Sequence, residues 1–148
     1  MRRALPISWI ILSGFGLIGS VISQLPFIHA GQSVVLLASL PVILPAALFM
    51  LALAAAYLLM IRTVNNKTSV WLGWGHVGAH LISGISAHGL SYLRNDIIVR
   101  GDKVDPSAFL TLAIISVVFG IIATLCFFAA MLSAALSAKR SIDLANFD

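Results

Sequence analysis

The histidines are the residues of this sequence whose chemistry is most informative. Four are present, His29, His76, His80 and His88, and each lies within or beside a long apolar run. An ionisable side chain is costly in such a run, so it usually faces protein or water. Because neutral imidazole binds metal ions and haem iron, the spacing of these residues decides which chemistry is open to them.

His76 and His80 are one helical turn apart, so they share one face of a helix. Two imidazoles on one face can bind a single metal ion, but a structural zinc site needs four ligands. No Cys, Asp or Glu occurs at the same depth of the surrounding run. We therefore interpret the pair as hydrogen-bonded structural histidines, with a metal site as the alternative.

A b-type haem offers a second use for histidine. Its iron takes two imidazoles, and within a membrane these come from two helices at matching depth. In the topology derived below, His29 and His88 both lie toward the outer side, and glycines in both runs let a flat macrocycle approach. They are the predicted ligands of such a haem b. The alternative for His29 is an ordinary interfacial residue that reaches water.

Catalytic motifs are absent from the sequence. It contains no GxSxG elbow, P-loop, HExxH motif or dinucleotide-binding glycine fingerprint. There is no Glu, and the single cysteine, Cys126, lacks a CxxC partner and is expected to be a small apolar side chain. The five acids all lie outside the apolar runs: Asp96, Asp102, Asp105, Asp143 and Asp148. We therefore expect no catalytic activity from the chain on its own.

The composition is that of a membrane protein. Hydrophobic residues make up 60% of the 148 residues and charged residues only 9%, whereas soluble domains carry about 25% charged residues. Such a chain needs lipid or other protein around it. The net charge of +4 comes from basic residues beside the apolar runs, which we assign to lipid headgroups and topology rather than to nucleic acid.

Four apolar runs are long enough to cross a bilayer, which takes about 20 helical residues. They cover residues 6–28, 34–61, 70–93 and 108–138. Because lipid offers no hydrogen bonds to the backbone, each run is predicted to be a helix. The expected fold is an all-α integral membrane protein: one transmembrane domain over residues 1–148, with four transmembrane helices in an up-down bundle.

Local signals refine the ends of these helices. Pro41 and Pro45 each remove a backbone donor, which predicts a kink or a late helix start in the second run. Asp105 followed by Pro106 predicts an N-cap and the first residue of the fourth helix.

Basic residues orient the four helices. Six of the nine fall on one side: Arg2, Arg3, Arg62, Lys67, Lys139 and Arg140. The positive-inside rule then places both termini on the cytoplasmic-type side of a bacterial inner membrane or an organellar inner membrane. Aromatic residues gather near the predicted interfaces, with Trp9, Tyr57, Trp71 and Trp74 inside and Tyr92 outside.

Small residues predict the faces by which the helices pack, because lipid supplies little hydrophobic drive between helices. In the first run these are Ser13, Gly16, Ser20 and Ser23, and in the third run Gly73, Ser83, Gly84 and Ala87 beside His76 and His80. We expect both faces to look inward, with bound lipid outside.

Three functional hypotheses follow. The leading one is a small non-catalytic accessory subunit of a larger membrane complex, packed against other membrane protein subunits. A respiratory or photosynthetic electron-transfer complex is the preferred setting, by analogy with the small helical subunits of such assemblies. The alternatives are a membrane haem subunit that uses His29 and His88, and an oligomeric small channel or transporter. No acid lies within a span to couple transport to protons.

Overall fold

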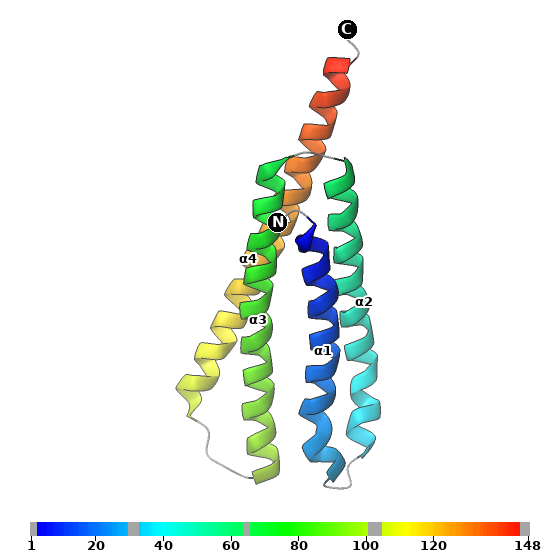
Figure 1. Ribbon diagram of the computed structural model, residues 1–148. Helices are drawn as coiled ribbons and strands as arrows, with labels where there is room; N and C mark the ends of the chain where they lie inside the picture. Colours follow the sequence, from blue (N-terminus) through cyan, green and yellow to red (C-terminus); the bar gives the residue numbers. More distant parts are fainter. Residues whose placement is uncertain (1–2, 30–32, 64–65, 101–104, 146–148) are drawn as a thin grey trace. The chain divides into compact units, whose positions relative to one another are not determined.

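The described part of the chain consists of four α-helices and contains no strand (Figure 1). The computed structural model describes the backbone of residues 3–29, 33–63, 66–100 and 105–145, and the side chains of residues 3–18, 44–62, 66–93 and 105–142. Helix α1 is Ala4–His29, α2 is Ser33–Thr63, α3 is Lys67–Arg100 and α4 is Pro106–Ala145. The predicted all-α class is confirmed. Helices α3 and α4 continue beyond the predicted ends at residues 93 and 138.

Among the described residues, two of the helices contain a segment long and apolar enough to cross a membrane. These segments are Leu44–Arg62 in α2 and Pro106–Ile142 in α4. The described side chains of α1 form a shorter apolar segment, Ala4–Ile18. Four crossings, and the side on which the termini lie, stay predictions.

The helices contact each other as two hairpins. The first hairpin, Met1–Asn65, contains α1 and α2, and the second, Asn66–Asp148, contains α3 and α4. In each, the second helix runs back alongside the first (Figure 1). The single domain expected from the sequence stays a prediction, and the hairpins are described one at a time below.

The first hairpin has an aromatic pair in its core. The rings of Trp9 and Tyr57 stack with centroids 6.2 Å apart and an interplanar angle of 6°, and both side chains are fully buried. Aromatic contacts of this kind add about 0.5–1.5 kcal/mol to the burial itself. Trp9 and Tyr57 thus lie in the core of the hairpin, whereas Trp71 and Tyr92 are exposed. The interfacial depth predicted for these residues stays a prediction.

Helix α2 is continuous through both of its prolines. Since it begins at Ser33, the predicted late start near Pro41 and Pro45 is wrong. A proline within a helix removes one backbone hydrogen bond, and its ring clashes with the preceding turn. Unwinding the preceding turns would leave many more backbone groups without partners, which is the larger penalty in apolar surroundings.

The start of α4 confirms the predicted cap. The Ser107 backbone N–H donates to Asp105 Oδ1 over 2.9 Å, and the Ser107 hydroxyl donates to Asp105 Oδ2 over 2.6 Å. Pro106 is the first helical residue, where its missing N–H costs nothing. The two bonds from Ser107 hold the pKa of the Asp105 carboxyl below its ordinary value.

The second hairpin keeps one antiparallel register along its length. Asn66 lies beside Ser133 and Ser137, Gly75 beside Cys126, and Gly89 beside Leu112. Each step along α3 is thus matched by an equal step back along α4. Consequently the last turns of α4, after Ser137, project past the start of α3 (Figure 1, red).

Candidate functional site

His76 and His80 form a small aromatic cluster with Phe127 of α4. The His76 ring centroid lies 6.1 Å from that of His80 and 5.5 Å from that of Phe127. His76 is 5% exposed. Among the side chains that the structure describes, no group of three or more His, Cys, Asp or Glu comes together. The cluster therefore offers two imidazoles and an aromatic wall, and a metal site here stays a prediction. The expectation that no Cys lies at this depth is wrong, because Cys126 Sγ would lie 3.3 Å from a Cβ on Gly75, the neighbour of His76.

The predicted haem ligands are placed on different hairpins. His88 is an exposed residue of α3. His29 is the last residue of α1, and its side chain lies outside the described residues. The haem site therefore stays a prediction.

The predicted packing face of α1 meets α2. The Ser13 hydroxyl is buried and donates to the Ala47 carbonyl oxygen over 3.2 Å. A Cβ added to Gly16 would lie 3.7 Å from Met50 Cε, an ordinary contact that leaves the helices close. The other two predicted residues of this face, Ser20 and Ser23, have side chains outside the described residues.

A reciprocal pair of serines joins α3 to α4. The Ser83 hydroxyl donates to the Ser116 carbonyl oxygen over 2.8 Å, and the Ser116 hydroxyl donates to the Ser83 carbonyl oxygen over 3.3 Å. One turn further along α4, a Cβ on Gly120 would lie 3.4 Å from Ser83 Oγ. Backbones meet closely here because both partners are small.

Glycines outside the predicted faces make the tightest approaches in this hairpin. A Cβ on Gly75 would lie 3.3 Å from Cys126 Sγ, and one on Gly89 would lie 3.2 Å from Leu112 Cδ1. Of the predicted residues, Gly73 is buried and Ala87 is exposed, and a Cβ on Gly84 would meet nothing within 4 Å.

Asn66 joins the start of α3 to α4 by hydrogen bonds. This role was not predicted from the sequence. Its Oδ1 accepts the Thr68 backbone N–H over 2.9 Å, which caps α3. Its Nδ2 donates to Ser137 Oγ over 2.7 Å, to Ser133 Oγ over 2.9 Å and to the Ser133 carbonyl oxygen over 3.2 Å. An Asn just before an apolar run is a known N-cap signal. Nothing in the sequence indicated the serines that it would meet.

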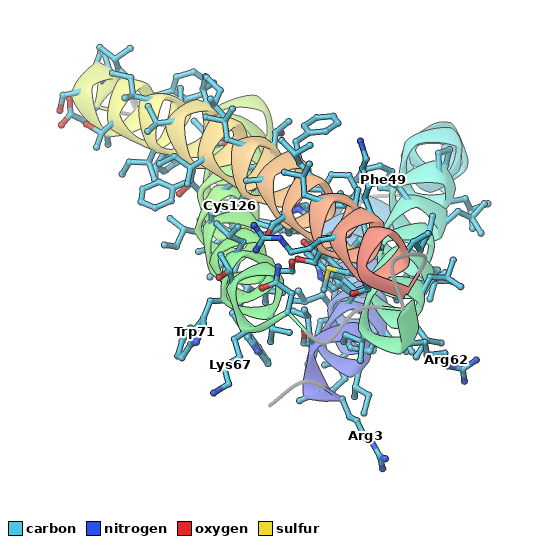
Figure 2. All side chains as sticks on the ribbon, turned by 90° about the horizontal axis from the view of Figure 1, so that it is seen from above. Arg3, Phe49, Arg62, Lys67, Trp71 and Cys126 are labelled. Carbon is cyan, nitrogen blue, oxygen red and sulfur yellow. The ribbon has the colours of Figure 1, made fainter. Side chains whose placement is uncertain are left out.

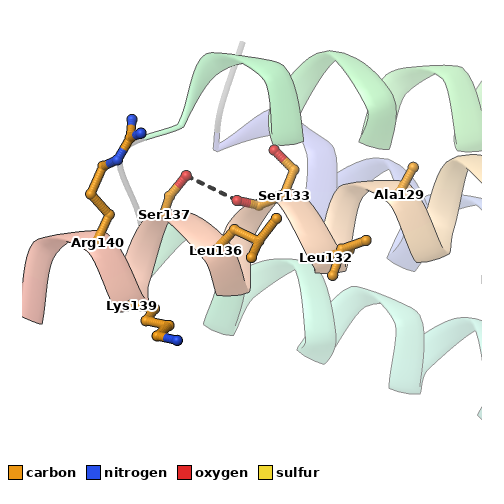
Figure 3. Close-up of a pocket in the computed structure, with 7 residues that line it drawn as sticks. All are labelled: Ala129, Leu132, Ser133, Leu136, Ser137, Lys139 and Arg140. Atoms are coloured by element: carbon orange, nitrogen blue, oxygen red, sulfur yellow. Dashed lines mark hydrogen bonds between the residues drawn. The ribbon is translucent and has the colours of Figure 1, made fainter. Parts of the chain in front are cut away.

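A cavity of about 640 Å³ lies along the C-terminal half of α4 (Figure 3). Its two serines are already engaged, because Ser133 and Ser137 accept from Asn66 and the Ser137 hydroxyl donates to the Ser133 carbonyl oxygen over 2.9 Å. Among the described residues that line it there is no His, Asp or Glu. The lining residues are Ala129, Leu132, Ser133, Leu136, Ser137, Lys139 and Arg140.

The described residues thus form packing contacts and apolar surfaces. Polar side chains such as Asn66, Ser83 and Ser116 are used to join helices. Comparison with family models, with curated proteins and with solved structures finds no match to this chain.

Proposed function

We propose that this chain is a multi-pass membrane protein whose four helices all cross the bilayer. At a rise of 1.5 Å per residue, even α1, with 26 residues, is about 39 Å long, which exceeds the roughly 30 Å hydrocarbon core. Large apolar side chains are exposed on every helix. The basic residues Arg3, Arg62, Lys67 and Lys139 lie at or near the helix ends that share one side in this topology, which supports both termini on the positive side.

Within that membrane, we propose a non-catalytic accessory subunit of a larger membrane protein complex. The observation that carries this proposal is the apolar length of α4. Its candidate span, Pro106–Ile142, has 37 residues, and only 6% of the most apolar stretch of this span is buried within the structure. That span is about 55 Å long. At a tilt of about 40°, the upper end of the usual range, the hydrocarbon core of roughly 30 Å still holds only about 39 Å of helix, or about 26 residues.

About eleven residues of this span then lie outside the hydrocarbon core, and they include apolar residues as well as Lys139 and Arg140. Large apolar side chains occur at both ends of the span, with Phe109 at 42% exposure and Ile142 at 61%, and the rise between these two residues is about 50 Å. Burying side chains of this size is worth about 1.5–3 kcal/mol each. A neighbouring subunit supplies that burial. The setting in an electron-transfer complex, and in a bacterial or organellar inner membrane, stays a prediction from the sequence.

The test is purification of the full-length chain from its native membrane in a mild detergent, followed by accurate mass and an absorption spectrum. We expect a complex much larger than the chain, with this chain at fixed stoichiometry. Leu136→Trp adds bulk but no charge, so it should release the chain from the complex, and Phe15→Trp, at an exposed position of α1, should not.

Other outcomes would contradict the proposal. A colourless monomer would remove the accessory role. A Soret band lost in His29→Ala or His88→Ala would favour the haem subunit, and a symmetric homo-oligomer with solute flux in proteoliposomes would favour a channel or transporter.

A further inference from the structure

An apolar groove of about 790 Å³ lies between α1 and α2 of the first hairpin. Its walls carry exposed apolar side chains, with Ile7 and Ile10 on one side and Leu58 on the other. The small side chains of Ala54 and Ala55 leave room between them. The lining residues are Arg3, Pro6, Ile7, Ile10, Leu51, Ala54, Ala55, Leu58, Ile61 and Arg62.

Two arginines stand at one end of this groove. Arg3 directly precedes α1, and Arg62 lies one residue before the end of α2. Because the helices are antiparallel, the two are at the same end of the hairpin. Both side chains are exposed and point outward (Figure 2). The first 65 residues contain no Asp or Glu, so the hairpin itself supplies no carboxylate to neutralise them.

The groove has the length of one lipid leaflet. From Arg62 to Leu51 the rise along α2 is about 16 Å, and half of a bilayer core of roughly 30 Å is about 15 Å. An acyl chain that starts at the arginines therefore stays against apolar side chains as far as the middle of the membrane. Guanidinium groups bind phosphate through paired, charge-assisted hydrogen bonds.

We propose that this groove binds one anionic phospholipid. Its phosphate lies on Arg3 and Arg62, and one acyl chain lies along Ala54 and Ala55. The site goes beyond the accessory role and rests only on the membrane part of the proposed function. It would give the first hairpin a fixed depth in the bilayer, set by the headgroup.

The experiment measures lipid binding to the full-length chain by native mass spectrometry, in a neutral detergent with added phosphatidylglycerol or phosphatidylcholine. The key variant is Arg3→Gln/Arg62→Gln. Its matched control is Lys139→Gln/Arg140→Gln, which removes the same charge from the other hairpin. A third variant, Ala55→Phe, fills the groove and keeps both arginines. Glycerol phosphate, a headgroup without acyl chains, serves as a competitor.

We expect the wild-type chain to bind phosphatidylglycerol in preference to phosphatidylcholine. Losing two cations at about 1 kcal/mol each should weaken that binding roughly 30-fold in Arg3→Gln/Arg62→Gln, and less than threefold in the control pair. Ala55→Phe should weaken it at least tenfold, since several methylene groups lose their burial at about 0.8 kcal/mol each. Glycerol phosphate in 100-fold excess should not compete.

Four results would overturn the site. Equal losses in the two double variants would reduce it to unspecific charge attraction. Unchanged binding in Ala55→Phe would remove the acyl chain from the groove, and competition by glycerol phosphate would leave a phosphate site only. If Arg3→Gln/Arg62→Gln released a partner subunit and left lipid binding unchanged, the two arginines would bind a protein and not a lipid. Alkaline extraction separates this from the proposed function: a wild-type chain that washes off the membrane refutes the membrane proposal itself.

Discussion

Asn66 is the residue at which one substitution separates two structural roles. Asn66→Asp retains the acceptor that caps α3 and removes the amide that donates to α4. Asn66→Ala removes both. The amide has two hydrogens for the three acceptors on Ser133 and Ser137, so it makes about two net bonds. The Ser137 hydroxyl already donates to the Ser133 carbonyl oxygen, so turning toward a new carboxylate would cost it that bond and would not add one.

The magnitudes follow from these contacts. Two part-buried hydrogen bonds at about 1 kcal/mol each give a loss of about 2 kcal/mol for Asn66→Asp. The lost cap adds about 1 kcal/mol, so Asn66→Ala should lose about 3 kcal/mol. Ser137→Ala should cost about 1 kcal/mol in the wild-type chain and nearly nothing once Asn66 is Ala, because the two residues share the interaction.

Unfolding in mixed micelles, titrated with SDS and followed by tryptophan fluorescence, measures these differences. Trp71 and Trp74 lie in α3, close to the cap. Ser141→Ala is the control, because its hydroxyl bonds only within α4, to the Ser137 carbonyl oxygen, and it should change little. If Asn66→Asp were as stable as the wild-type chain, or Ser137→Ala kept its full cost beside Asn66→Ala, the assigned role of Asn66 would be refuted.

Three further predictions concern other parts of the chain. Ser83→Ala and Ser116→Ala should each cost about 0.6 kcal/mol, measured by the same SDS titration, and the costs should add, because each hydroxyl donates to a backbone carbonyl that the other substitution retains; a double variant that loses no more than either single variant would contradict the two bonds. Asp105 has a folded pKa below its unfolded value, so its stabilisation of α4 is complete above about pH 3.9 and is lost as the pH falls through the folded pKa. The protection of the amides at the start of α4, taken relative to their intrinsic exchange rate at each pH, should therefore fall in acid, and not in Asp105→Asn, which caps without titrating. In a Cys126→Ala background, Ser141→Cys and Ala108→Cys should react with an impermeant maleimide from opposite sides of sealed vesicles; labelling from one side would contradict the crossing of α4.

The sequence by itself determined which segments are helical. Long runs with almost no charge must form their own backbone hydrogen bonds, and a helix does this without any partner. Local side-chain chemistry also determined one helix start, because the cap by Asp105 involves a neighbour two residues away. Such features depend on contacts along the chain, and sequence spacing contains that information.

The tertiary structure alone decided which small residues pack and which polar residues join helices. Gly75 and Gly89 meet α4, whereas a Cβ on Gly84 would meet open space, although all three occur in the same Gly- and Ser-rich helix. The choice depends on how each helix is rotated and on what the opposite helix presents at that level. Asn66 reaches Ser133 and Ser137 only because α3 and α4 hold one antiparallel register, and partners so far apart in sequence leave no local pattern to read.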